Sequence, residues 1–307
     1  YSAVAETTGG ANNTGIGHLA LQNNTTASDN TAVGFEALRA NTTGTPNTAV
    51  GYRALKANTT GIRNTAIGYM AGALVTEGYR NTFVGTYSGQ VATTGFHNTA
   101  IGANAMKNTT DGYRSTAVGH NALYNNVKGM DNTAIGAFSL ESNNGGGNEW
   151  GQNVAVGSGA LTTSNGSSGN VALGYWAANL HQGNPIHAIG YKALASNTTG
   201  SSNTASGYEA LTANTTGDNN TAVGTDALTA NTTGDNNTAL GYATLDANTT
   251  GTQNTGLGRS SLTTNTTGNY NTGVGYLSLQ ANTTGSSNSA LGMDSLYANT
   301  TGSYNLS

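Results

Sequence analysis

Residues that commonly carry catalysis or bind metal ions are sparse in this chain and do not cluster. The histidines are dispersed at His18, His97, His120, His181 and His187, and there is no cysteine. Acidic residues are too thinly spread to form a carboxylate pair or a calcium-binding repeat. No spacing matches a metal-ligand pattern. The sequence therefore predicts no enzymatic activity, no metal ion and no cofactor.

The tripeptide Asn-Thr-Thr recurs along the chain, and each copy is formally an acceptor for N-glycosylation. Its asparagines are Asn24, Asn41, Asn58, Asn108, Asn197, Asn214, Asn231, Asn248, Asn265, Asn282 and Asn299. Their spacing follows a larger repeat, so we interpret them as stacked turn side chains that hydrogen-bond to one another and to the backbone. A glycosylated rod is the alternative.

An aromatic residue often follows a glycine at the same place in that repeat. The residues are Phe35, Tyr52, Tyr69, Tyr175, Tyr191, Tyr208, Tyr242 and Tyr276. Such a stripe could form stacking platforms for sugars, because an aromatic face is apolar and tyrosine adds a hydroxyl. The alternative, which we prefer, is that these rings shield a sheet edge or pack between chains.

A rank of threonines raises the possibility of ice binding, because ice-binding β-solenoids display flat threonine arrays. It runs from Thr14 to Thr133 and resumes from Thr204 to Thr272, with Val154, Val171 and His187 between. We expect the threonine side to be partly apolar and buried, which argues against this function.

The centre of the chain departs most from the repeat. An insertion within 141–152 contains Glu149 and Trp150, and the irregular unit after it adds Trp176 and His181. Insertions in solenoids map to loops, and loops often bind partners. These four residues are our candidate ligand-binding site, and the alternative is a tolerated defect capped by aromatic residues.

A repeat of about seventeen residues must position all these side chains. Its fifth residue is glycine in every unit: Gly17, Gly34, Gly51, Gly68, Gly85, Gly102, Gly119, Gly136, Gly157, Gly174, Gly190, Gly207, Gly224, Gly241, Gly258, Gly275 and Gly292. Within one unit, Thr48–Val50 suits a short strand, Ala54-Leu55 a second, and residues 57–61 a turn. Stacking of such units predicts an all-β parallel β-solenoid, or β-roll, of about seventeen coils.

Alternation along the strand separates two faces. We expect Thr48 and Val50 to share the apolar, buried side. The opposite side is small and suggests the close approach of another chain, with Ala49, Ala117, Ala222 and Ala239 as candidate oligomer contacts. Because each coil offers a thin core, we expect lengthwise association as a homotrimer.

The composition limits the kinds of partner that we expect this chain to bind. Charged residues make up 8% of the 307 residues and the formal net charge is −4, so nucleic-acid binding is not expected. No apolar run is long enough to span a membrane, and membrane insertion by this segment is not expected. We expect residues 1–12 to be a lead-in or cap, 13–304 to be one repeat domain, and 305–307 to begin a further repeat in a fragment of a longer chain.

The segment Thr216–Ala227, which contains Asn-Thr-Ala-Val-Gly-Thr-Asp-Ala, resembles the head repeats of YadA-type trimeric autotransporter adhesins. Similar arrays occur in predicted bacteriophage tail fibres and bacterial surface proteins. The resemblance implies a left-handed trimeric β-roll used in attachment. The prediction is a structural and adhesive extracellular fibre segment, on a cell or virion surface, whose partners are its own copies and cell-surface glycans or a host receptor. Ice binding is the alternative, followed by a carbohydrate-active β-helix enzyme.

Overall fold

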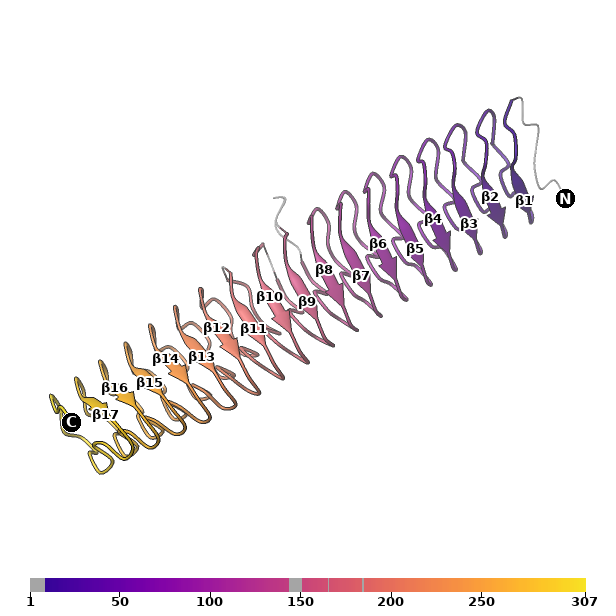
Figure 1. The fold of residues 1–307 in the computed structure, drawn as a ribbon. Helices are drawn as coiled ribbons and strands as arrows, with labels where there is room; N and C mark the ends of the chain where they lie inside the picture. Colours follow the sequence, from indigo (N-terminus) through magenta and orange to yellow (C-terminus); the bar gives the residue numbers. More distant parts are fainter. Residues whose placement is uncertain (1–8, 144–150, 165, 184) are drawn as a thin grey trace. The chain divides into compact units, whose positions relative to one another are not determined.

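The computed structural model describes residues 9–143, 151–164, 166–183 and 185–307. The chain divides into two compact units, Tyr1–Asn153 (unit 1) and Val154–Ser307 (unit 2). Figure 1 labels the strands of both units. In the described residues the regular elements are parallel three-residue strands joined by turns, and there is no helix. The prediction of an all-β parallel β-solenoid with a period of about seventeen residues is confirmed.

Unit 1 contains eight strands in its described part. Each pairs in parallel with the next at a register of seventeen residues, as in Thr48↔Thr65. The strands are β1 (Thr14–Ile16), β2 (Thr31–Val33), β3 (Thr48–Val50), β4 (Thr65–Ile67), β5 (Thr82–Val84), β6 (Thr99–Ile101), β7 (Thr116–Val118) and β8 (Thr133–Ile135).

Unit 2 repeats the arrangement with nine strands in its described part. The strands are β9 (Val154–Val156), β10 (Val171–Leu173), β11 (His187–Ile189), β12 (Thr204–Ser206), β13 (Thr221–Val223), β14 (Thr238–Leu240), β15 (Thr255–Leu257), β16 (Thr272–Val274) and β17 (Ser289–Leu291). The short repeat leaves the sheet in register, because Val171 pairs with His187 and Ala172 with Ala188. The missing residue is therefore absorbed outside the strands.

Each coil has one strand, so the predicted second strand at Ala54-Leu55 is wrong. The segment turns sharply instead, with Arg53 and Leu55 in the left-handed region at φ 55° and 48°. Such a conformation costs a non-glycine residue about 1–2 kcal/mol. The Leu55 side chain is fully buried and its N–H donates to the Ala71 carbonyl of the next coil at 3.0 Å, which offsets that cost.

The glycine after each strand is required by two constraints at once. Gly119 has a φ of 140°, and a Cβ there would lie 2.5 Å from the carbonyl oxygen of Gly136 in the next coil. Any side chain would therefore need both an unfavourable backbone conformation and wider coil spacing. This explains why the position is glycine throughout the repeat.

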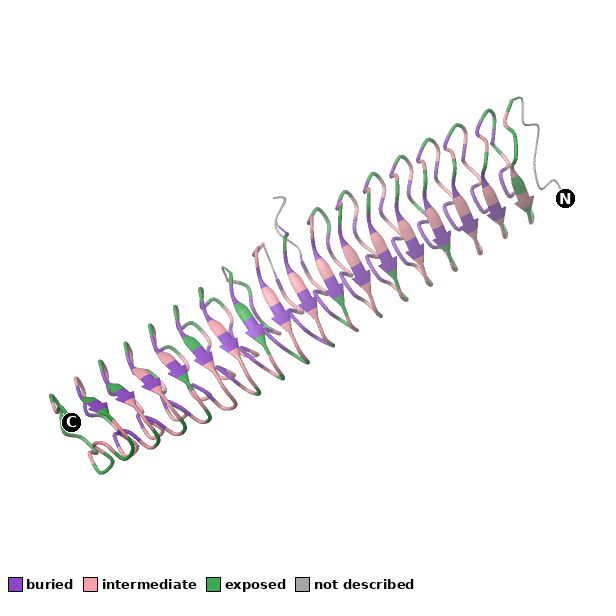
Figure 2. Cartoon of the chain, viewed as in Figure 1, coloured by how far each residue is buried: buried purple, intermediate pink, exposed green. Residues whose placement is uncertain are grey.

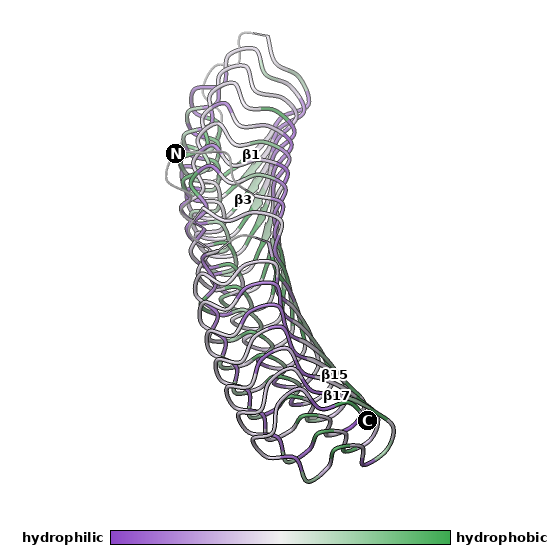
Figure 3. Cartoon of the chain, turned by 90° about the vertical axis from the view of Figure 1, so that its left-hand side faces the viewer, coloured by the Kyte–Doolittle hydropathy of each residue, from purple (hydrophilic) through white to green (hydrophobic). Residues whose placement is uncertain are grey.

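The core lies on the inner side of the strands. From β2 to β17 the central strand residue is buried while its two neighbours are half-buried or exposed, as Figure 2 shows by the purple strand centres with pink or green ends. Alanine at the strand centre and alanine-leucine after the glycine fill the coil. Figure 3 shows hydrophobic and hydrophilic segments recurring in the same order from coil to coil.

The described residues on both sides of the four-residue insertion keep the regular stacking. Asn143 still donates to Oδ1 of Asn126 at 3.0 Å, and the Gln152 N–H donates to the Met130 carbonyl at 3.0 Å. Both bonds follow the pattern of the regular coils. The extra residues of the sequence therefore fall between Asn143 and Gly151, and the stacking on either side is intact.

Candidate functional site

The outward side of the strands carries threonine and a β-branched or leucine residue in two parallel ranks. Thr48 and Val50 are half-buried, while Ile67 is 42% and Leu240 50% exposed. The prediction that this side is buried is therefore wrong. Val154 and Val171 also belong to this outer face, and His187 is exposed on it.

The alanines predicted to contact another chain lie inside their own coils instead. Ala49, Ala117, Ala222 and Ala239 are all 0% exposed. The prediction is wrong because alternation separates two faces without saying which one is inside. The alanine-leucine pair after the glycine already fills most of the coil interior, so the strand centre has room for alanine and the larger valine, isoleucine or leucine at the strand end lies outside.

The Asn-Thr-Thr asparagines form an internal hydrogen-bond ladder. Nδ2 of Asn231 donates to Oδ1 of Asn214 at 2.8 Å and to the Gly234 carbonyl at 3.0 Å, while its own Oδ1 accepts from Asn248 at 2.8 Å. Asn214, Asn231 and Asn248 are fully buried. This confirms the structural interpretation and rules out glycosylation of these three in the folded coil.

An interruption of the ladder shows that each asparagine donates to the preceding coil and accepts from the next one. Val75, Ala92 and Thr109 replace the asparagine in three consecutive coils, and Oδ1 of Asn58, just before this run, has no hydrogen-bond partner among the described residues. The tripeptide of Asn108 lies one residue out of register. Asn108 is therefore half-buried and bonds Oδ1 of Asn125 at 2.7 Å.

The predicted aromatic stripe is a stack of rings. The Phe35 and Tyr52 centroids are 5.3 Å apart and those of Tyr52 and Tyr69 5.0 Å, with the planes inclined by 8° and 6°. In unit 2, Tyr191 stacks on Tyr208 at 5.0 Å. The ring faces cover one another. His18 lies 5.6 Å from Phe35 and Tyr87 lies 5.3 Å from Tyr69 between ring centroids, at the two ends of the unit 1 stack, so that stack offers little ring face to a sugar.

The other two predicted tyrosines of the stripe are separated by a cation. Tyr242 is 51% and Tyr276 44% exposed. The Arg259 guanidinium lies 5.6 Å from the Tyr242 ring centroid and 5.9 Å from that of Tyr276. Here cation–π contacts replace ring stacking.

The central candidate site is divided between inside and outside. Trp176 is 44% exposed and lies against Tyr175, with 5.3 Å between ring centroids. His181 is fully buried at an asparagine position of the ladder, where its Nδ1 lies 2.7 Å from Nδ2 of Asn197. The structure thus does not bring Trp176 and His181 together. Glu149 and Trp150 lie outside the described residues.

Trp176 borders a shallow groove in unit 2. The groove has a volume of about 230 Å³ and is lined by Trp176, Asn179, Leu180, Lys192, Ala195, Ser196 and Thr212. The Lys192 ammonium lies 5.2 Å from the Tyr191 ring centroid and 5.9 Å from that of Trp176. Of the predicted central site, Trp176 therefore lies on an accessible surface beside the aromatic stack.

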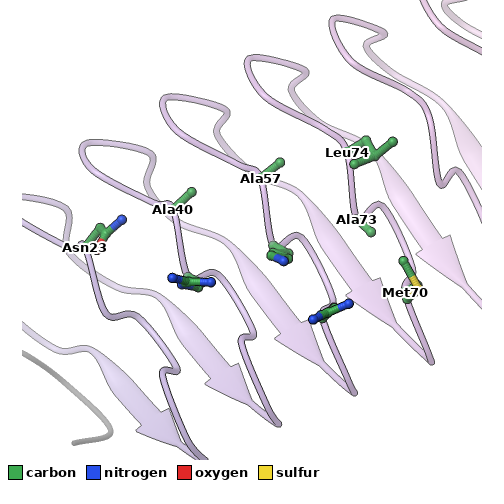
Figure 4. Close-up of a pocket in the computed structure, with 9 residues that line it drawn as sticks. Asn23, Ala40, Ala57, Met70, Ala73 and Leu74 are labelled. Atoms are coloured by element: carbon green, nitrogen blue, oxygen red, sulfur yellow. The ribbon is translucent and has the colours of Figure 1, made fainter.

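A larger groove in unit 1 is a site that the sequence analysis missed. It has a volume of about 350 Å³ and is lined by Asn23, Arg39, Ala40, Arg53, Lys56, Ala57, Met70, Ala73 and Leu74. Figure 4 shows Asn23, Ala40, Ala57 and Leu74 on successive coils at the same place in the repeat. The groove therefore runs across coils rather than into one coil.

Three cations of this groove surround one carboxylate. Glu36 pairs with Arg39 at 2.6 Å, with Arg53 at 2.7 Å and with Lys56 at 3.0 Å, and its side chain is 6% exposed. Burial opposes ionisation, but the hydrogen bonds from Lys56 and Arg53 outweigh it and lower the pKa of Glu36 below its ordinary value. Glu36 therefore stays ionised at neutral pH, and the cluster has two positive charges in excess.

Unit 2 has an acidic counterpart in the same ranks of the repeat. Asp246 is half-buried, and burial, followed by the charge of Asp226, raises the pKa of its carboxyl group. Among the described residues, no three His, Asp or Glu side chains gather closely enough to hold a metal ion.

Within the described part of the chain, no helix reaches the length and apolar character that crossing a membrane requires.

Comparisons with protein-family models, with curated proteins and with solved structures give no match to this chain. The resemblance to YadA-type head repeats and to tail-fibre arrays therefore stays a prediction.

Proposed function

We propose that the chain is a segment of a structural and adhesive extracellular fibre, on a cell or virion surface, that assembles as a homotrimer through the outer strand face. The observation that carries the proposal is the pair of ranks that recurs on the outer strand face within each unit. One rank is mostly threonine, and the other is mostly valine, isoleucine or leucine. A soluble chain rarely leaves so regular an apolar rank uncovered.

The face of one unit has the size of a functional surface patch rather than of a complete interface. The eight described strands of unit 1, each three residues long, present a footprint of roughly 400 Å², taking about 3.3 Å per residue and about 4.8 Å between strands. Patches of this size on monomers are often functional. Closed cyclic symmetry would cover the same face on every copy.

The test is native mass combined with substitutions on that face. We expect the wild-type chain to have close to three times the mass of one chain. Ile67→Lys combined with Leu240→Lys should give single chains with an unchanged circular dichroism spectrum, because buried lysines would be unpaired. Tyr270→Lys is the matched control, since Tyr270 is 58% exposed and lies off the strands. A monomeric wild type, or dissociation by the control alone, would refute the proposal.

Ice binding is the second candidate, and the outward direction of the threonines favours it. Thr204, Thr221, Thr238, Thr255 and Thr272 occupy one register of the outer face in successive coils. The two functions exclude each other on this face, because ice binding needs it uncovered. A monomer that facets growing ice, and loses this effect in Thr221→Lys with Thr238→Lys, would support ice binding instead.

A further inference from the structure

We propose that the groove formed by Arg39, Arg53 and Lys56 in unit 1 binds an anionic polysaccharide. The inference deepens the proposed adhesive role by naming a ligand class. It concerns a groove within one chain, so its test is separate from the native-mass experiment.

The charge of the groove selects an anion. The side chains of Arg39, Arg53 and Lys56 are 39%, 33% and 33% exposed, whereas the Glu36 side chain is almost covered. Glu36 thus pairs with all three cations, and part of each cation remains exposed to solvent. Nε of Arg53 bonds Glu36, while its two terminal nitrogens have no hydrogen-bond partner in the described part of the chain. Those nitrogens form the two-pronged donor that suits a carboxylate or a sulfate.

The spacing of the groove favours a linear polymer over a single small anion. Arg39 and Lys56 occupy the same position of consecutive repeats, seventeen residues apart. Stacked coils are separated by about 4.8 Å, so these cations recur along the direction of stacking. A polymer with acidic groups along its length could contact both.

The apolar part of the groove favours a saccharide. Ala40, Ala57, Ala73 and Met70 supply methyl and methylene surface beside the cations, which suits the C–H faces of sugar rings. The Arg53 guanidinium lies 4.9 Å from the Tyr52 ring centroid, so the stack of Phe35, Tyr52 and Tyr69 is adjacent to the groove. A flat lipid surface would contact the exposed cations but would not reach the alanines that line the groove.

The groove beside Trp176 in unit 2 is built in the same way. Trp176 and Lys192 occupy the rank of Glu36 and Arg53, and Lys192 also lies beside an aromatic stack. This groove contains a single cation, so we expect it to bind the same polymers more weakly.

The experiment measures binding of the full chain to polygalacturonate and to dextran sulfate by calorimetry, with neutral dextran as the uncharged probe. We expect both acidic polymers to bind and dextran not to bind. Arg39→Gln with Lys56→Gln should weaken binding by about tenfold or more, since two charge-assisted contacts are lost. The double variant should also flatten the dependence of affinity on sodium chloride between about 50 mM and about 500 mM.

The matched control removes two positive charges elsewhere in unit 1. Arg63 and Lys128 are exposed and do not line the groove, so Arg63→Gln with Lys128→Gln should leave the affinity within about twofold. Lys56→Gln alone keeps both arginine contacts to Glu36, and its weaker binding can be read even if the double variant misfolds. Selectivity of polygalacturonate over dextran sulfate, or the reverse, would identify the acidic group.

Three outcomes would overturn the proposal. The first is equal loss of affinity in the groove variant and in the control variant, which would indicate a bulk charge effect. The second is equal binding of neutral dextran. The third is a lack of binding to both acidic polymers, with or without binding to phosphatidylserine vesicles or duplex DNA.

Discussion

Phe83 allows a sharp test of how the coil interior is filled. It occupies a strand-centre position that is alanine or glycine in the other coils, and it is fully buried. The position that is leucine in most coils is glycine in its own coil, at Gly89, and in the preceding coil, at Gly72. A Cβ on Gly72 would lie 3.0 Å from Cδ2 of Phe83, and a Cβ on Gly89 would collide with Cδ1 and Cε1 of that ring. One large side chain therefore replaces two leucines.

The single substitutions should each be costly and their combination should not. Phe83→Ala removes a buried ring and should lower the free energy of unfolding by about 3–5 kcal/mol. Gly89→Leu overpacks the same space and should cost about 1–3 kcal/mol or more. Combining Phe83→Ala with Gly72→Leu and Gly89→Leu restores the usual alanine-leucine filling. The backbone suits leucine there, because φ is 57° at Gly89 and 48° at Leu55. We expect the triple variant to lie within about 1 kcal/mol of the wild type.

The assay is urea unfolding of the full chain, together with hydrogen exchange at the Gly85 amide. That amide bonds the Ile67 carbonyl at 2.8 Å and reports local opening, which matters because repeat arrays depart from two-state unfolding. Ala222→Leu, at a strand centre without compensating glycines, is the uncompensated comparison and should destabilise the coil itself. A triple variant no more stable than Phe83→Ala would refute this account of the core.

Three further outcomes are expected. Asn231→Ala should cost about 1–3 kcal/mol more than Asn58→Ala in urea unfolding, because Asn231→Ala leaves Oδ1 of Asn214 without its donor. Asn58→Ala leaves Oδ1 of Asn41 without a donor but removes Oδ1 of Asn58, which has no partner already, so the number of unpaired oxygens stays the same. Equal costs would contradict the ladder. The pKa of Glu36 is lowered from 4.5, so its stabilisation is present above that value and is lost as pH falls through the folded-state pKa. Glu36→Gln should therefore flatten the acid limb of thermal stability measured between about pH 7 and about pH 3. The pKa of Asp246 is raised from 3.8, so the stability contributed by this group is present below that value and lost as pH rises through the folded-state pKa. Asp246→Asn should stabilise the chain at neutral pH and have less effect in acid, and a higher melting temperature at both pH values would point to another cause.

The sequence predicts the strands and their register because glycine, asparagine and threonine recur at fixed spacing. It does not predict which strand face is inside. In Thr221–Val223, two of three residues point away from Ala222, and hydrophobicity alone assigns valine to the core. The volume of the coil reverses this, because the adjacent Leu228 already fills the interior. The inner face could not be predicted because the spacing of residues carries no information on the width of the coil.

The groove in unit 1 could have been found by comparing equivalent positions of successive repeats. Glu36 and Arg53 share one position of the unit, and Arg39 and Lys56 share another. A carboxylate with three cations in two neighbouring ranks is then visible without coordinates. The separation of Trp176 from His181 follows in the same way, because His181 falls at the ladder position of Asn197. Regular stacking of the repeat, and not an irregular segment of the sequence, assembles the unit 1 groove.

Stacking also explains how such a fold could change ligands without changing its core. The ladder position of Asn231 and the turn position of Gly119 are fixed by contacts to the next coil, and substitution there propagates along the stack. The rank that contains Glu36 and Arg53 is under no such constraint: it also carries Met70, Trp176 and Asp226, all within the same coil geometry. Charge and aromatic content on this rank can therefore vary from coil to coil, and the ligand of each groove is set by the run of residues on a few neighbouring coils.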